Sequence, residues 1–344
     1  MILLSLVAIG VVWVVVSNIL KSGTQQASSG LGQLLVSIEL QNVNMKSNGD
    51  VDIGVKRNVG AGGLTGINFI VSDGVNTKVI KKDTTLQELN SNTFTLTASE
   101  LGSNFGLVKK VSIAPIIDSN TGSVVDQKNY SNKEILMNLG AVSWWKLDGN
   151  ANDEIGGNSG NIVGTVSFVD GKYGKAGSFD GSSGYITVAD NPSLRITAYS
   201  VSLLIKPNGV PDEMWKGIVG KPGRNYNLWL NNVGFVHHRF HTSISTNAGA
   251  PNTPTGSVSW DQWSNIVIVN DGTTAKTYIN GIEKASGATG GSLVVDNTPL
   301  YIGRNLDGGN VQYFKGQIED VIIFNQALTA QQIKSLYQLD LTSS

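Results

Sequence analysis

The sequence contains no cysteine. This absence excludes disulfide bonds, thiol catalysis and cysteine-based metal sites, so stability must come from hydrophobic cores, bound metals or neighbouring molecules. Charged residues are also few, at 15% of the chain, and the formal net charge is −1. A nucleic-acid partner usually requires a basic face, so we expect no nucleic-acid partner.

The first 20 residues carry no ionisable side chain, and the first charge is Lys21. A helix of this length is about 30 Å long, enough to cross the hydrocarbon core of a bilayer. Three roles fit such a segment: a cleaved signal peptide, a permanent membrane anchor, and a helix packed against copies of itself in a filament. A signal peptide normally begins with a basic region, which this segment lacks, so the anchor and the filament are favoured.

The apolar N-terminus, MILLSLVAIGVVWVVVSNIL, resembles that of mature type IV pilins, from which a leader peptide has been removed. Ser5 stands where bacterial pilins usually carry glutamate, whereas archaeal pilins and archaellins lack that glutamate. The resemblance implies a hydrophobic helix over residues 1–30 that is inserted in the membrane before assembly. Copies of the chain would then polymerise into an extracellular, cell-surface filament. The alternative is a monomeric surface protein anchored by the same helix.

From Leu34 the pattern of apolar residues changes to period two, in short segments bounded by Gly, Asn or Asp. Turn signals occur at 48–50, 73–74 and 120–122, at the spacing expected of an antiparallel sandwich. This pattern predicts an immunoglobulin-like β-sandwich over residues 31–140. A hydrophobic helix followed by a small sandwich is also the arrangement of archaeal pilins and archaellins.

Residues 141–344 have a different character. The dipeptide Asn-Gly at 280–281 predicts a type I′ hairpin, and Thr329 with Gln332 predicts a short helix from about Ala330. The segments VSWWKLDGNAND, GKAGSFDGSSGYITV and QIEDVIIFNQALTAQQIKSLYQ together resemble the laminin G-like, concanavalin A-like lectin family. The resemblance implies a two-sheet jelly roll. The expected fold class is therefore mainly β, with a long N-terminal helix, an immunoglobulin-like sandwich and a concanavalin A-like jelly roll.

The loop at 148–153 places several oxygen donors in a glycine-containing turn, which suits a hard cation such as Ca²⁺. The resemblance implies a structural calcium site formed by Asn150, Asn152 and Asp153 with an acidic residue of the segment QIEDV, for which Asp320 is our candidate. The alternative is an ordinary turn held by its own backbone hydrogen bonds.

All three histidines lie in residues 236–241. On a strand, His237 and Arg239 share one face, which favours a polar surface for a sugar or a neighbouring subunit. Trp215 is the best candidate for an exposed aromatic ring, and Tyr226 and Trp229 are candidates for the same face. These five residues form the predicted glycan-binding set.

The sequence shows no motif typical of a glycosidase or a serine hydrolase. A glycosidase needs two carboxylates about 5 to 9 Å apart across a cleft, and no close E-x-D-x-E arrangement occurs. No G-x-S-x-G nucleophile motif occurs either. We therefore expect a non-enzymatic filament subunit with an outward lectin-like domain that serves adhesion or glycan binding.

Overall fold

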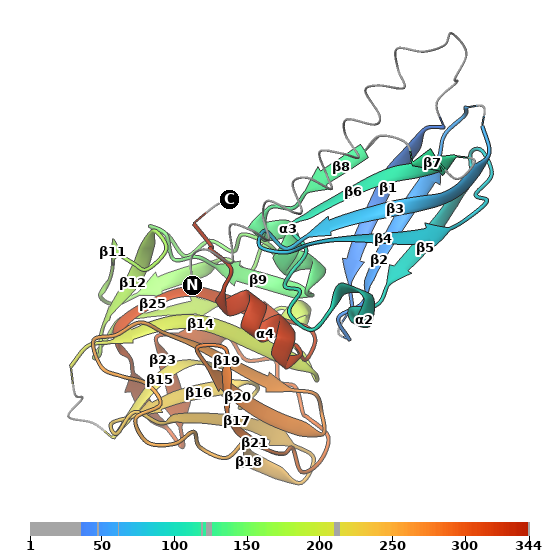
Figure 1. Ribbon diagram of the computed structural model, residues 1–344. Helices are drawn as coiled ribbons and strands as arrows, with labels where there is room; N and C mark the ends of the chain where they lie inside the picture. Colours follow the sequence, from blue (N-terminus) through green and yellow to red (C-terminus); the bar gives the residue numbers. More distant parts are fainter. Residues whose placement is uncertain are drawn as a thin grey trace. The chain divides into compact units, whose positions relative to one another are not determined.

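The computed structural model describes residues 36–342, except 47, 61, 118–119, 122–125 and 210–213. The chain divides into two compact units between Asn138 and Leu139. Each unit is built mainly from antiparallel strands (Figure 1).

The expected fold class needs one correction. The described residues contain three short α-helices: α2 (Ala98–Leu101), α3 (Asn132–Asn138) and α4 (Ala330–Tyr337). None of them is long and apolar enough to cross a membrane. The long apolar helix in the predicted fold class is therefore wrong for this part of the chain, whose apolar residues follow the two-residue period of strands. The predicted helix and filament core, residues 1–30, lie outside the described residues.

The first unit contains two antiparallel sheets. One has the strand order β1 (Ile38–Met45), β2 (Val51–Arg57), β5 (Ser91–Leu96). The other has the order β4 (Thr77–Asp83), β3 (Leu64–Ser72), β6 (Lys110–Ile117), β7 (Asn120–Thr121), and β8 (Asp126–Asn129) also pairs with β6. The rings of Phe69 on β3 and Phe94 on β5 have centroids 5.2 Å apart, so the two sheets share one core.

The second unit is a sandwich of two larger sheets. The seven-stranded sheet has the order β10 (Gly160–Val163), β13 (Tyr185–Val188), β22 (Leu300–Ile302), β15 (Trp215–Gly220), β16 (Asn227–Asn231), β17 (Val236–Thr242), β18 (Ser245–Gly249). The eight-stranded sheet has the order β11 (Val166–Asp170), β12 (Lys175–Asp180), β25 (Lys315–Phe324), β14 (Tyr199–Pro207), β19 (Ser264–Asn270), β20 (Thr274–Ile279), β21 (Ile282–Ala288), with β9 (Ala141–Trp145) beside β25. A 3₁₀ turn, η1 (Pro192–Leu194), precedes β14.

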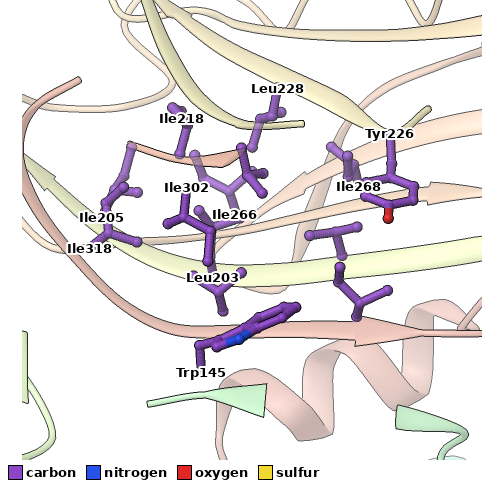
Figure 2. Close-up of a cluster of buried hydrophobic side chains, with 14 of the residues drawn as sticks. Trp145, Leu203, Ile205, Ile218, Tyr226, Leu228, Ile266, Ile268, Ile302 and Ile318 are labelled. Atoms are coloured by element: carbon purple, nitrogen blue, oxygen red, sulfur yellow. The ribbon is translucent and has the colours of Figure 1, made fainter. Parts of the chain in front are cut away.

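The core of this unit lies between the inner faces of the two sheets (Figure 2). Leu203 and Ile205 from β14 meet Ile218 from β15 and Ile302 from β22, and all four side chains are fully buried. Strand alternation directs every second side chain away from this core, toward the outer face of each sheet. The predicted jelly roll is confirmed.

Two local predictions for this unit are also confirmed. Asn280 and Gly281 both have positive φ, 51° and 76°, as a type I′ hairpin requires. Helix α4 begins after Thr329, whose hydroxyl accepts a hydrogen bond from Gln332 N at 3.2 Å, while Gln332 Oε1 accepts one from Thr329 N at 2.9 Å.

We expect Leu203→Ala to lower the free energy of unfolding of the second unit by about 2–5 kcal/mol, because it leaves a cavity in a close-packed core. The control Ile282→Ala, at a side chain 60% exposed, should change it by less than about 0.5 kcal/mol. Every tryptophan among the described residues lies in this unit, so tryptophan fluorescence during urea unfolding provides the measurement. Equal effects of the two substitutions would contradict the assigned core.

Candidate functional site

A two-stranded hairpin, β23 (Arg304–Asp307) and β24 (Asn310–Tyr313), covers part of the outer face of the seven-stranded sheet. Trp229 alternates with the core residues Leu228 and Leu230, so its ring points outward, and its Nε1 donates to Gln312 Oε1 of the hairpin at 2.6 Å. The hairpin approaches so closely that a Cβ on Gly217 would lie 2.2 Å from Asn305 N. Glycine at 217 therefore allows the hairpin to reach the sheet.

Asn305 connects the hairpin to two strands of the sheet through side-chain hydrogen bonds. Its side chain is 1% exposed, and Nδ2 donates to Val219 O at 3.0 Å and to Leu228 O at 2.8 Å. These bonds lie beside a β-bulge between Gly217 and Val219, where the register of β15 and β16 shifts. The hairpin position is thus set by buried hydrogen bonds, which are costly to leave unmade.

Between the hairpin and strands β15 to β18 lies a pocket of about 220 Å³, which we call the outer pocket. Trp229 on β16 stands directly opposite His237 on β17, with ring centroids 6.0 Å apart, and the rings of Trp215 and His237 are 4.9 Å apart. The lining residues are Trp215, Arg224, Trp229, His237, Arg239, Asn247, Asp307 and Gln312.

The two arginines of the outer pocket have different partners. Arg224 forms an ion pair with Asp307, donates to Asn247 Oδ1 at 2.5 Å, and lies 5.7 Å from the centre of the Trp229 ring. Arg239 donates from Nε to His237 Nε2 and from Nη1 to Asn247 O, the latter at 3.1 Å. Burial lowers the pKa of Arg239, and the positive charge of Arg224 lowers it further.

His237 is neutral in this arrangement. Burial lowers its pKa, although the hydrogen bond with Asn252 opposes that effect. Because His237 Nε2 accepts from Arg239, its proton belongs on Nδ1, which lies 2.6 Å from Asn252 Oδ1. The outer pocket therefore holds two guanidinium groups and one carboxylate, a net charge of about +1.

The structure brings four of the five predicted ligand residues to this pocket: Trp215, Trp229, His237 and Arg239. Trp229 is only 3% exposed, so it forms the floor of the pocket, whereas Trp215 is partly exposed. Side chains of β17 alternate between buried and half-buried, with His237 and Arg239 on the outer side.

The prediction that Tyr226 lines the same face as Trp215 was wrong. The side chain of Tyr226 is fully buried in the core, and its hydroxyl donates to Leu194 O at 2.9 Å. Arg224 and Tyr226 both have positive φ, 61° and 35°, so the chain turns sharply before β16. Tyr226 has the same parity as the core residues Leu228 and Leu230, and it is three positions from Trp229, so strand alternation itself places Tyr226 and Trp229 on opposite faces.

Sequence reasoning missed Arg224, Asn247, Asp307 and Gln312. Asp307 lies 83 residues from its partner Arg224, and the same separation joins Trp229 and Gln312. The one local signal was the sequence Asp-Gly-Gly-Asn at 307–310, a turn signature that identifies a hairpin but not its position on the sheet.

Two of the predicted calcium residues, Asn150 and Asp153, accept hydrogen bonds from backbone N–H groups. Asp153 accepts backbone hydrogen bonds from Trp144, Ile155 and Asn158 at 2.9 to 3.0 Å, and Asn150 Oδ1 accepts one from Asn152 N at 2.8 Å. Over the described ranges, no group of three or more acidic or histidine side chains is arranged to hold a metal. Calcium binding at this loop stays a prediction.

Asp320 is a buried carboxyl group on β25. It is 3% exposed, Oδ1 accepts from Trp144 Nε1 at 2.7 Å, and Oδ2 has no hydrogen-bond partner among the described residues. Burial raises the pKa of Asp320 to about 8, although the Trp144 hydrogen bond opposes the shift. This carboxyl group is therefore protonated over much of the ordinary pH range.

Comparison with known proteins identifies the type of domain. Residues 180–334 match the profile of the Concanavalin A-like lectin/glucanases superfamily, so the second unit contains a laminin G-like, concanavalin A-like lectin domain. No curated protein matches the sequence.

Several solved structures resemble the chain. Domain 4 of AbnA, an extracellular arabinanase from Geobacillus stearothermophilus in complex with arabinotriose, is 25% identical, with 58% of this chain and 98% of that chain covered and a TM-score of 0.46. The binding domain of Paraclostridial Mosquitocidal Protein 1 is 16% identical, with 58% and 52% covered and a TM-score of 0.49. The binding domain of Botulinum Neurotoxin DC in complex with SialylT is 13% identical, with 58% and 51% covered and a TM-score of 0.46. This chain thus spans about half the length of these two toxin domains.

We expect Asn305→Ala to loosen the hairpin, because Val219 O and Leu228 O lose their donors at a buried site. Hydrogen exchange of residues 304–313 should accelerate, while that of β14 and β19 stays slow. Asn310→Ala, at an exposed position of the same hairpin, is the control and should leave exchange unchanged. Unchanged exchange in Asn305→Ala would show that other contacts hold the hairpin.

The raised pKa of Asp320 predicts a pH dependence of stability. The folded protein keeps a proton that the unfolded chain releases above its ordinary pKa of 3.8, so the contribution of Asp320 to the free energy of unfolding should fall as pH rises from about 4 to about 8. Burial lowers the pKa of His238 to about 3, so the contribution of His238 has the opposite sign. Asp320→Asn should remove the Asp320 contribution and make the slope of the free energy of unfolding against pH more positive than in the wild type, because an amide does not titrate. The measurement is urea unfolding followed by tryptophan fluorescence at several pH values.

Asp180→Asn provides the control for this measurement. Burial alone would raise the pKa of Asp180, but hydrogen bonds from Ser183, Ser182 and Gly184 outweigh it and lower the pKa. The contribution of Asp180 is therefore lost only under acidic conditions, and its replacement should leave the slope between pH 4 and 8 unchanged. A wild-type slope in Asp320→Asn would contradict the assignment.

Proposed function

We propose that the second unit is a carbohydrate-binding domain and that the outer pocket is its glycan site. The observation that supports this most strongly is the convergence of Trp215, His237 and Arg239 in one pocket of a lectin-type fold. Such a combination of aromatic rings with a few fixed polar groups is typical of ligand sites.

The chemistry of the pocket suits a sugar. The apolar C–H face of a pyranose packs on an aromatic ring, and Trp215 offers a partly exposed indole held by the rings of Phe235 at 5.6 Å and His237 at 4.9 Å. Sugar hydroxyl groups both donate and accept hydrogen bonds, which Asn247 and Gln312 at the rim provide. A ring already fixed by its neighbours loses little side-chain entropy on binding.

Binding without hydrolysis is the activity we propose. Among the described residues that line the outer pocket, Asp307 is the only carboxylate, and it is paired with Arg224. Glycoside hydrolysis ordinarily requires two carboxyl groups, one on each side of the scissile bond.

The filament role is not part of this proposal. It depended on the helix predicted for residues 1–30, and no observation on the described residues supports self-assembly. An extracellular location stays a prediction, and it suits a domain whose partners are surface glycans.

We expect Trp215→Ala to weaken glycan binding by at least about tenfold, because a stacking surface is removed from the pocket. Trp263→Ala removes a partly buried tryptophan outside the pocket and is the matched control. The measurement is binding of the full chain to a glycan array, with melting midpoints of both variants to verify folding. Equal binding by wild type and Trp215→Ala would place the glycan site elsewhere.

A further inference from the structure

Arg239 is the cation of the outer pocket that lacks an acidic partner. Among the described residues that line the pocket, Asp307 is the only carboxylate, and it forms its ion pair with Arg224. No ion pair of Arg239 occurs in the described part of the chain. The pocket is thus positive within a chain whose formal net charge is −1, so its charge is a local feature.

The guanidinium group of Arg239 is held in a fixed orientation. Nε donates to His237, and His237 is held in turn by Asn252. Nη1 donates to Asn247 O, whereas Nη2 has no hydrogen-bond partner within the described ranges. Both N–H donors of Nη2 and one of Nη1 therefore remain, and free N–H donors on a guanidinium bind the oxygens of a carboxylate.

The neighbouring charges favour an anionic ligand. Arg224 and Arg239 share Asn247 as a hydrogen-bond acceptor, one through its side-chain oxygen and the other through its backbone carbonyl. Their mutual repulsion contributes to lowering the pKa of Arg239, after the larger effect of burial. A negative group placed against Arg239 would relieve that repulsion, and the charge of Asp307 is already compensated by Arg224.

We infer that the outer pocket selects carboxylated sugars, with Arg239 binding the carboxylate while Trp215 packs against the sugar ring. This inference rests on the proposed glycan-binding function and adds the chemical class of the ligand. It assigns Arg239 as the residue that determines specificity and Trp215 as a source of affinity for sugars in general.

The test is isothermal titration of the full chain with three matched oligosaccharides at 150 mM salt, which screens long-range attraction. One ends in glucuronic acid, the second in the methyl ester of that acid, and the third in glucose. We expect the acid to bind at least about tenfold more tightly than the ester or the neutral sugar. Arg239→Gln should abolish this preference, and Arg239→Lys should retain part of it because it keeps the charge but loses the planar edge.

Arg304→Gln is the matched control for charge. The Arg304 guanidinium lies 3.6 Å from the ring centre of Tyr185 and 4.0 Å from that of Tyr301, outside the pocket. Tyr185 and Tyr301 alternate with the core residues Ile186 and Ile302, so Arg304 lies on the same outer face. Its replacement removes one positive charge from this face and should leave the preference for the acid intact. Melting midpoints verify that each variant is folded.

The outcomes distinguish a failure of the inference from a failure of the proposed function. Binding of all three sugars with equal affinity, lost in Trp215→Ala, would overturn the inference and leave the proposed function standing. Binding of none of them would count against both. An equal loss of preference in Arg304→Gln and Arg239→Gln would show general electrostatic attraction and would overturn the role of Arg239. Tighter binding of a matched 6-sulfated sugar than of the acid would overturn the choice of carboxylate.

Discussion

The buried side chain of Asn305 is the contact on which the outer pocket depends. Its two hydrogen bonds to Val219 O and Leu228 O, at 3.0 and 2.8 Å, tie the β23–β24 hairpin to two strands of the sheet. This close approach needs glycine at 217, where any larger residue would collide with the hairpin backbone. With the hairpin in this position, Asp307 forms an ion pair with Arg224, and Gln312 accepts a hydrogen bond from Trp229. The hairpin thereby forms one side of the outer pocket, and the sheet forms the other.

In the second unit, side chains that stabilise the core alternate along the strands with side chains that line the outer pocket. Inward side chains such as Leu228 and Phe240 are fully buried, while outward neighbours on the same strands, including His237 and Arg239, line the outer pocket. Substitutions at the pocket can therefore change binding with little effect on the core. Such an arrangement suits a binding domain, because a rigid sheet holds the polar groups of the site in fixed positions.

The sequence was most informative where structure follows local rules. Alternation placed His237 and Arg239 on one face, the Asn-Gly dipeptide at 280–281 identified a hairpin, and the Thr329 cap located helix α4. The prediction for Tyr226 failed because it grouped Tyr226 with Trp229, three positions away, although an odd separation places two strand residues on opposite faces. The turn signature at 307–310 identifies the hairpin but not the partners of Asp307 and Gln312, because only the folded hairpin brings them to residues 83 positions away. The long helix was expected from the uncharged apolar run at residues 1–20 and from the resemblance to pilins, whereas the fold of the described residues is set by period-two strands.

The most direct test of the central claim uses the indole N–H signals of the tryptophans in an NMR titration of the ¹⁵N-labelled full chain with a glucuronic-acid-terminated oligosaccharide. Trp215 and Trp229 line the outer pocket, whereas Trp144 and Trp145 donate their indole N–H groups to Asp320 Oδ1 at 2.7 Å and to Asn158 O at 2.8 Å, away from it. We predict that the signals of Trp215 and Trp229 shift together and saturate while those of Trp144 and Trp145 stay in place. Saturable binding that shifts Trp144 or Trp145 and leaves Trp215 and Trp229 unchanged would contradict a glycan site in the outer pocket.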